Sequence, residues 1–230
     1  MDLRKYKALI FDLFHTLTSV ESARAPGKGT SAILGVSRKD WNDQLLKYSQ
    51  DRLRGKIKDP FRIIKKMANA INPSTPEEII REATLTRLSR FKYSLKHINR
   101  SVLDTLAKLK DMGKLIGLIS NGDVHEVAGW DKSPLNKYFD SVVFSCNAGY
   151  VKPEKEIYEL SLKELKVNPT ECLFIGDGGS DELRGAKEIG MSTVLVTYVI
   201  EKIWPEKIDE RKLYADFEIS ELKELLLNER

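Results

Sequence analysis

The sequence predicts an α/β protein with a doubly wound parallel sheet and an all-helical domain inserted after the first strand. From about residue 96 onward, short apolar runs alternate with helical stretches, a pattern typical of parallel strands joined by helices. The first run, residues 8–11, contains only Ala, Leu, Ile and Phe, which indicates a strand buried on both faces. Between these regions, residues 18–95 show helical periodicity and almost no strand pattern.

Start and stop signals divide the predicted insertion into three helical segments. The segments are residues 37–53, 59–72 and 74–91. Ser37 is a suitable N-cap for the first, because apolar residues then recur every three or four positions. Asp59 followed by Pro60 is an N-cap with proline at the first helical position, so it marks the start of the second.

The remaining elements alternate regularly. Predicted strands cover residues 114–119, 141–145, 172–175, 193–196 and, as a short edge strand, 215–219. Predicted helices cover residues 103–109, 153–162, 183–189 and 221–227. We therefore expect residues 1–17 and 96–230 to form a Rossmann-like α/β core domain and residues 18–95 to form the helical domain.

Composition and charge exclude several classes of protein. The formal net charge of +4 comes from 38 basic and 34 acidic residues, without the clustering that a nucleic-acid-binding surface needs. No apolar stretch approaches the length of a membrane span, and the first residues do not resemble a secretory signal. Cys146 and Cys172 stand in or beside apolar runs, as buried cysteines do in a reducing compartment. We expect a cytoplasmic protein that acts on a small molecule, with no nucleic-acid or membrane partner. The sequence gives no prediction of its oligomeric state.

Carboxylates, a hydroxyl and a cation follow the carboxyl ends of the predicted strands. These residues are Asp12, Ser120, Lys152, Asp177 and Asp181. Parallel strands place their carboxyl ends at one edge of the sheet, where ligands bind in open α/β folds. Carboxylate and carbonyl oxygens suit Mg²⁺, while lysine and serine suit the oxygens of a phosphoryl group. We therefore expect a magnesium and phosphate site in which Asp12 attacks phosphorus as a nucleophile.

Four stretches resemble, in the same order, the four motifs of the haloacid dehalogenase (HAD) superfamily of hydrolases. They are residues 11–17; residues 118–121; residues 151–154 with 157–158; and residues 175–177 with 181 and 185–186. Together they span nearly all of the predicted core. The inserted helices resemble the helical cap of that family, so the resemblance implies that residues 18–95 are a cap domain.

The resemblance implies a role for each matching residue. Asp12 would be the catalytic nucleophile, and Lys152 would be a catalytic cation on the transferred group. Ser120 and Asn121 would bind the substrate. The ligands of Mg²⁺, direct or through water, would be Asp12, the main-chain carbonyl of Phe14, Asp177 and Asp181.

His15 and Thr16 are two further candidate substrate contacts. His15 stands where the family usually has glycine, so it is either a turn residue or, because imidazole titrates near neutrality, a substitute acid. Thr16 is either a substrate contact or a turn hydroxyl.

Phe14 departs from the pattern of the family's phosphatases. They place a second aspartate there, which protonates the leaving oxygen and then activates water, and such help is worth about 10²–10⁴-fold in rate. The family's dehalogenases, whose halide leaving group needs no proton, usually carry an aromatic residue at this position. The fourth motif indicates the opposite, because dehalogenases replace the metal carboxylates by serine and asparagine, whereas this chain has Asp177 and Asp181.

Three functions are therefore open. The first is magnesium-dependent hydrolysis of a small organic phosphate that has a good leaving group or receives a proton from the cap or His15. The second is hydrolysis of a carbon–halogen bond in a haloacid, for which Arg24 is the candidate cap arginine. The third is binding of metal or phosphate with little catalysis.

Overall fold

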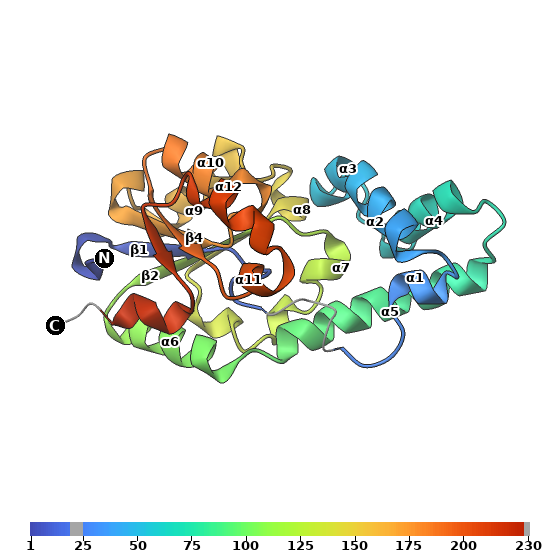
Figure 1. Cartoon of the computed structure of the whole chain (residues 1–230), viewed down its shortest axis with the longest axis horizontal. Coiled ribbons are helices and arrows are strands. Elements are labelled where there is room, and N and C mark those ends of the chain that lie inside the picture. Colours follow the sequence, from blue (N-terminus) through green and yellow to red (C-terminus); the bar gives the residue numbers. More distant parts are fainter. Residues whose placement is uncertain (19–24, 228–230) are drawn as a thin grey trace.

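The centre of the protein is a six-stranded sheet in which every neighbouring pair of strands runs parallel (Figure 1). A computed structural model describes residues 1–18 and 25–227. The strands are β1 (Ala8–Phe11), β2 (Leu115–Ser120), β3 (Ser141–Phe144), β4 (Cys172–Gly176), β5 (Ser192–Val196) and β6 (Phe217–Ile219). Their order in the sheet is β3-β2-β1-β4-β5-β6. The predicted doubly wound, Rossmann-like fold is confirmed.

Both faces of the sheet are buried, which explains the unbroken apolar runs. Along β1, Leu9 and Phe11 pack into one hydrophobic cluster, while Ala8 and Ile10 pack into another. The helices over the first face are α6 (Arg100–Asp111) and the 3₁₀ helix η7 (Leu222–Leu226). The helices over the second face are α9 (Lys155–Leu165) and α10 (Glu182–Glu188).

The chain reverses its direction of travel across the sheet between β1 and β4. From β1 it moves outward to β2 and β3, then returns to build β4, β5 and β6 on the other side of β1. At such a switch point the connections diverge, leaving a crevice outside the strand ends. Phe11 of β1 is in register with Leu118 of β2 and Ile175 of β4, so the residues after these three positions meet at one place.

A helical segment lies beside the carboxyl edge of the sheet and has a hydrophobic cluster of its own (Figure 1). It comprises α1 (Thr30–Ile33), α2 (Arg38–Lys47), α3 (Ser49–Leu53), α4 (Pro60–Ile71) and α5 (Glu77–Lys96). Trp41, Ile64, Met67 and Ile80 are among its buried residues. The stretch predicted as one helix over residues 37–53 is two helices that meet at Tyr48. The division of the chain into two domains stays a prediction.

Several short helices have too few residues to show a periodicity in the sequence. Four are α-helical: α7 (Val124–Val127), α8 (Ser145–Ala148), α11 (Ile200–Ile203) and α12 (Ile208–Lys212). Six are 3₁₀ helices: η1 (Leu3–Lys5), η2 (Trp130–Lys132), η3 (Asn136–Tyr138), η4 (Pro169–Glu171), η5 (Gly179–Asp181) and η6 (Pro205–Lys207). The helix predicted at residues 221–227 is the 3₁₀ helix η7. Within the described residues, no helix is long and apolar enough to cross a membrane.

A buried cluster of charges joins the helical segment to the core. Arg52 of α3 donates to Asp123 at 2.9 Å and to Glu126 at 3.1 Å, and Arg87 of α5 donates to Glu126 at 2.6 Å. Asp123 and Glu126 also form a capping box at the start of α7. Burial opposes ionisation of Asp123, yet its hydrogen bond with His125 and the charges of the two arginines hold its pKa well below the ordinary value. These directional contacts place α3 and α5 over the edge of the sheet.

Gly55, just after α3, packs directly against the core. Its φ is +65°, and a Cβ there would lie 1.9 Å from the carbonyl oxygen of Cys146 in α8. Gly35 has a similar φ of +67° but no atom within 4 Å of the same position. The two glycines therefore share a backbone strain, and only Gly55 has a steric constraint.

We predict that Gly55→Ala destabilises the protein more than Gly35→Ala. Each change costs about 1–2 kcal/mol, because a side chain disfavours positive φ. Gly55→Ala should cost about 1–3 kcal/mol more, because α3 and α8 must separate to admit the methyl group. Urea unfolding of the two variants measures this difference. Equal losses would contradict the close contact between α3 and α8.

Candidate active site

Asp12 follows β1 directly and lies at the switch point of the sheet. Its backbone N–H donates to the carbonyl of Ile175 at 2.9 Å, so the parallel ladder with β4 holds the start of the loop. The side chain is buried, with one carboxylate oxygen accepting from Thr16 at 3.1 Å and the other from Lys152 at 2.5 Å. Thr16 thus orients the carboxylate of Asp12.

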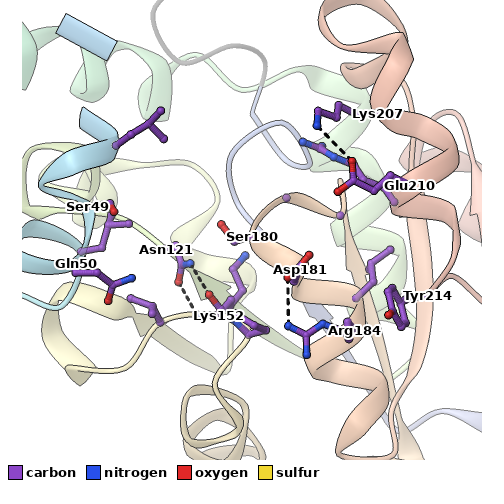
Figure 2. Close-up of a pocket in the computed structure, with 18 of the residues that line it drawn as sticks. Ser49, Gln50, Asn121, Lys152, Ser180, Asp181, Arg184, Lys207, Glu210 and Tyr214 are labelled. Carbon is purple, nitrogen blue, oxygen red and sulfur yellow. Dashed lines mark hydrogen bonds and ion pairs between the residues drawn. The ribbon is translucent and has the colours of Figure 1, made fainter. Parts of the chain in front are cut away.

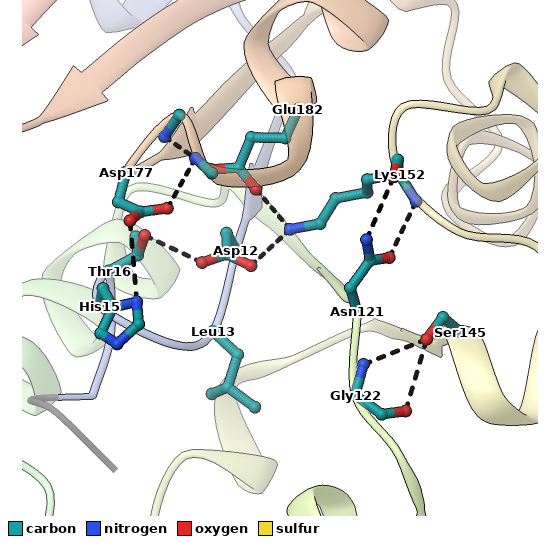
Figure 3. A network of polar contacts seen from close by, with 12 residues as sticks. Asp12, Leu13, His15, Thr16, Asn121, Gly122, Ser145, Lys152, Asp177 and Glu182 are labelled. Atoms are coloured by element: carbon teal, nitrogen blue, oxygen red, sulfur yellow. Dashed lines mark hydrogen bonds and ion pairs between the residues drawn. The ribbon is translucent and has the colours of Figure 1, made fainter. Parts of the chain in front are cut away.

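Lys152 reaches between two carboxylates from different strands' loops (Figure 3). Its ammonium donates to Asp12 and to Glu182, and all three side chains are buried. The Asn121 side chain holds the backbone of Lys152 from both sides, accepting from its N–H at 2.8 Å and donating to its C=O at 3.1 Å. Asn121 is therefore occupied in positioning Lys152, and its predicted contact with substrate stays a prediction.

The loop after β4 turns sharply and returns Glu182 toward the strand. Gly178, Ser180 and Asp181 all have positive φ, which makes this turn possible. Glu182 then accepts from the N–H of Gly178 at 2.9 Å. A Cβ at Gly176 would lie 2.1 Å from the Glu182 carboxylate, so only glycine at that position lets the carboxylate approach β4.

Three carboxylates meet at this place and fit a divalent cation. Asp12, Asp177 and Glu182 each offer an oxygen, and these oxygens all lie within 4.8 Å of one another. Hard oxygen ligands on neighbouring loops are the donors that Mg²⁺ prefers. Asp181, in contrast, has a side chain that is 63% exposed and paired with Arg184 at 3.2 Å. The structure thus brings together Asp12 and Asp177 of the predicted ligands, adds Glu182, and places Asp181 apart.

Burial governs the ionisation of the group. It raises the pKa of Asp12 above the ordinary value, although the charge of Lys152 opposes the shift. It raises the pKa of Glu182 well above the ordinary value, and the nearby charge of Asp12 adds to this. Burial disfavours the Lys152 ammonium, but the two carboxylates outweigh it and raise its pKa. Lys152 therefore favours the charged form of both carboxylates, and both favour its charged form, whereas the charge of Asp12 disfavours that of Glu182.

Ser120 stands at the end of β2, next to β1 in the sheet. Its side chain is fully buried, and its hydroxyl has no hydrogen-bond partner among the described residues. A buried polar atom without a partner is costly, so this hydroxyl is available to bind a group that enters the site. This fits the predicted contact of Ser120 with a phosphoryl group.

Phe14 and His15, in the loop between Asp12 and Thr16, contact different kinds of neighbour. Phe14 packs edge-on against Phe91 of α5, with ring centroids 5.7 Å apart. His15 has a φ of +67°, and its ring lies 3.7 Å from the Asp177 carboxylate and edge-on to Trp204. The predicted catalytic, binding and metal roles of these residues stay predictions, and Arg24 lies outside the described residues.

A cavity of about 330 Å³ opens above Asp12. Its walls carry the aromatic rings of Phe14, Phe91 and Trp204 and the guanidinium groups of Arg52 and Arg211. A larger groove of about 860 Å³ adjoins it, lying between α2–α3 and the segment around α12 (Figure 2). Lys152, Asn121 and Arg52 line both spaces, so the groove leads to the buried carboxylates.

Sequence reasoning missed several residues of this site. Glu182 follows Asp181 directly, so the sequence offers it as a second candidate carboxylate. Nothing in the sequence indicates that the positive φ values before it turn its side chain inward. Arg211 and Trp204 lie in residues 197–214, for which no element was predicted. Arg52 lies on a predicted helix, and no periodicity marks a charged residue that faces the core.

The profile of the haloacid dehalogenase-like hydrolase family matches residues 6–190. The match covers β1 to β4 and every motif on which the resemblance was based, and it ends before β5. The chain belongs to the haloacid dehalogenase-like hydrolases. The family resemblance stated from the sequence is therefore confirmed, and with it the assignment as a hydrolase.

Two names recur among the curated relatives of this HAD-like hydrolase. Bifunctional epoxide hydrolase 2 of Rattus norvegicus is 31% identical over 137 residues, which are 57% of this chain and 24% of that protein. Glyceraldehyde 3-phosphate phosphatase of Pyrococcus furiosus is 35% identical over 125 residues, 53% of this chain and 50% of that one. The protein of the same name from Methanocaldococcus jannaschii is 27% identical over 229 residues, 96% of this chain and 95% of that one. The chain thus spans half or less of the first two relatives and nearly all of the third.

Solved structures share the fold of this HAD-like hydrolase. A structure described as a dehalogenase has a TM-score of 0.68 and 23% identity, and the match covers 96% of each chain. A HAD family enzyme from Bacteroides thetaiotaomicron, solved with magnesium and inorganic phosphate, has a TM-score of 0.61 and 20% identity. That match covers 83% of this chain and 94% of the other.

We predict that Lys152→Met loses more stability as the pH rises. The pKa values of Asp12 and Glu182 are already raised in the folded protein, so folding favours the protonated form of both carboxyl groups. The stability that this preference contributes is present below the ordinary pKa of each group and is lost as the pH rises through the folded-state pKa. Without Lys152 both values rise further. The deficit relative to the parent should grow from about pH 5 to about pH 8 and reach about 3–5 kcal/mol.

The control is Lys155→Met, which removes an equal charge from a side chain that is 66% exposed. Denaturant unfolding at several pH values measures both deficits. A Lys152→Met deficit that is constant or shrinks with pH would mean that Lys152 is not the counterion of these carboxylates.

Proposed function

We propose that this HAD-like hydrolase hydrolyses small organic phosphates, with Mg²⁺ as cofactor and Asp12 as nucleophile. The observation that carries the proposal is the buried set of Asp12, Asp177 and Glu182, whose oxygens lie within 4.8 Å of one another. A dehalogenase needs no such set of carboxylates, because it needs no metal ion to neutralise the charge of a phosphoryl group. Retention of the carboxylates around Asp12 therefore favours phosphoryl transfer.

In this proposal the residues of the chain divide the work. The Asp12 oxygen bonds to phosphorus as the bond to the ester oxygen breaks, and water then hydrolyses the aspartyl phosphate to release inorganic phosphate. Lys152 and the free hydroxyl of Ser120 bind the phosphoryl oxygens, while Thr16 fixes the angle of the attacking carboxylate. When bound by Asp12, Asp177 and Glu182, with the carbonyl of Phe14 as a further ligand, Mg²⁺ would offset negative charge on the phosphoryl group.

Phe14 narrows the range of substrates. An ester whose leaving group is a weak base departs without a proton, whereas an alkoxide needs one. Phe14 packs on Phe91 and supplies no proton. His15 is a titratable side chain on the same loop and lines the cavity, so it is the candidate donor for esters with poorer leaving groups.

Two further observations support this proposal. Two relatives are named glyceraldehyde 3-phosphate phosphatase; one matches 53% of this chain and the other matches 96%. Helices α3 and α5 overhang the cavity, where Arg52 and Phe91 line its wall, so we propose that residues 18–95 act as a cap that excludes water from the site. The aromatic side chain of Phe14 still supports the dehalogenase alternative.

We expect the protein to release phosphate from an aryl phosphate in the presence of Mg²⁺ and to lose this activity in a chelator. Asp12→Asn, which keeps the size of the side chain, should lower kcat by at least roughly 10³-fold. The same samples are tested for halide release from short 2-haloacids. Metal-independent halide release would support the dehalogenase alternative, and no activity in either assay would support a binding protein.

Adjacent acidic residues offer a matched test of the ligand set. Glu182→Gln should weaken Mn²⁺ binding by roughly 10–100-fold, because its buried carboxylate belongs to the cluster. Asp181→Asn should change it less than about twofold, because its exposed carboxylate pairs with Arg184. Titration calorimetry measures both affinities. The reverse result would identify Asp181 as the ligand that the sequence predicts.

A further inference from the structure

We propose that Arg211 is an internal counterion of Asp177 that a divalent cation must displace, so that Arg211 sets the affinity of the metal site. This inference rests on the proposed magnesium site. Arg211 belongs to α12, between β5 and β6, outside the four motifs on which the family resemblance was based. Its guanidinium lies on one of the three clustered carboxylates.

Both oxygens of Asp177 already accept hydrogen bonds. One accepts from the backbone N–H of Gly179 at 3.0 Å. The other accepts from Arg211 at 2.7 Å and lies 3.7 Å from the ring of His15. The same Arg211 nitrogen donates to the backbone carbonyl of Asp177 at 2.9 Å. The Gly179 contact is part of the loop backbone, so the side chain of Arg211 is the donor that can withdraw.

The surroundings of Arg211 are built to receive it. A Cβ at Gly178 would lie 2.8 Å from the Cβ of Arg211, so glycine there makes room for the side chain. The guanidinium lies 5.7 Å from the ring of Trp204, which in turn meets His15 edge-on. A cation beside an aromatic face and a carboxylate is well stabilised. Arg211 is therefore held on Asp177 while no metal is bound.

The balance of charge explains why the metal and Arg211 compete. The three carboxylates carry three formal negative charges, and Lys152 and Arg211 carry two positive ones. Adding a divalent cation with Arg211 in place gives an excess positive charge in a buried site. Withdrawal of Arg211 makes the group neutral. Arg211 must therefore leave Asp177 when the metal binds.

The test measures Mn²⁺ binding by titration calorimetry in the parent, Arg211→Gln and Arg184→Gln. Arg211→Gln should bind Mn²⁺ roughly tenfold more tightly than the parent, because no counterion must be displaced. Arg184→Gln removes the same charge from a nearby arginine, 32% exposed, that pairs with Asp181 and Glu188, so it should change the affinity less than about twofold. In chelator, Arg211→Gln should also melt at a lower temperature than the parent and gain more from added Mn²⁺.

Each outcome decides one question. The counterion role of Arg211 is supported if Arg211→Gln alone binds Mn²⁺ more tightly than the parent, or if Arg211→Gln binds Mn²⁺ and the parent does not. An equal gain in both variants, or equal or weaker binding in Arg211→Gln, overturns it while leaving the proposed metal site intact. If neither the parent nor Arg211→Gln binds Mn²⁺, the counterion and the proposed magnesium site are both overturned.

Discussion

The ammonium of Lys152 is the charge on which the site depends. It lies in the interior of the protein between Asp12 and Glu182, which come from loops at the ends of β1 and β4. Two buried carboxylates this close repel each other and lose hydration, so they need a cation with nearly ideal geometry. The neighbours of Lys152 supply that geometry, because Asn121 grips its backbone and Gly176 lets Glu182 approach the sheet. The Asp12 carboxylate is thus held by electrostatics as much as by packing.

The same principle positions the helical segment. Arg52 and Arg87 meet Asp123 and Glu126 in a second buried cluster beside the cavity. Apolar contacts tolerate sliding, whereas buried ion pairs lose much of their stabilisation when one partner is displaced. The position of α3 and α5 over Asp12 is therefore specified by directional contacts, and Arg52 is both part of this cluster and part of the cavity wall.

The site combines features of two kinds of HAD chemistry. Phe14 removes the usual second acid and adds an aromatic wall with Phe91, which suits a leaving group that needs no proton. Asp177 and Glu182 bring carboxylate oxygens close to Asp12, as the proposed Mg²⁺ site requires and a halide-releasing site does not. The two features are compatible in a phosphatase whose leaving group is a weak base or is protonated from elsewhere in the cavity.

The sequence by itself determined the sheet and the residues at its carboxyl edge. Apolar runs such as residues 8–11 read clearly as strands because burial on both faces leaves no polar position, and Asp12, Ser120 and Asp177 follow such runs directly. The tertiary structure decided which neighbours share the site. Asp181 and Glu182 look equivalent in the sequence, but positive φ values in the loop turn one to solvent and the other onto Lys152. Arg211 joins the site from a five-residue helix that has no periodicity to predict, because its place depends on the packing of α12 against the loop after β4.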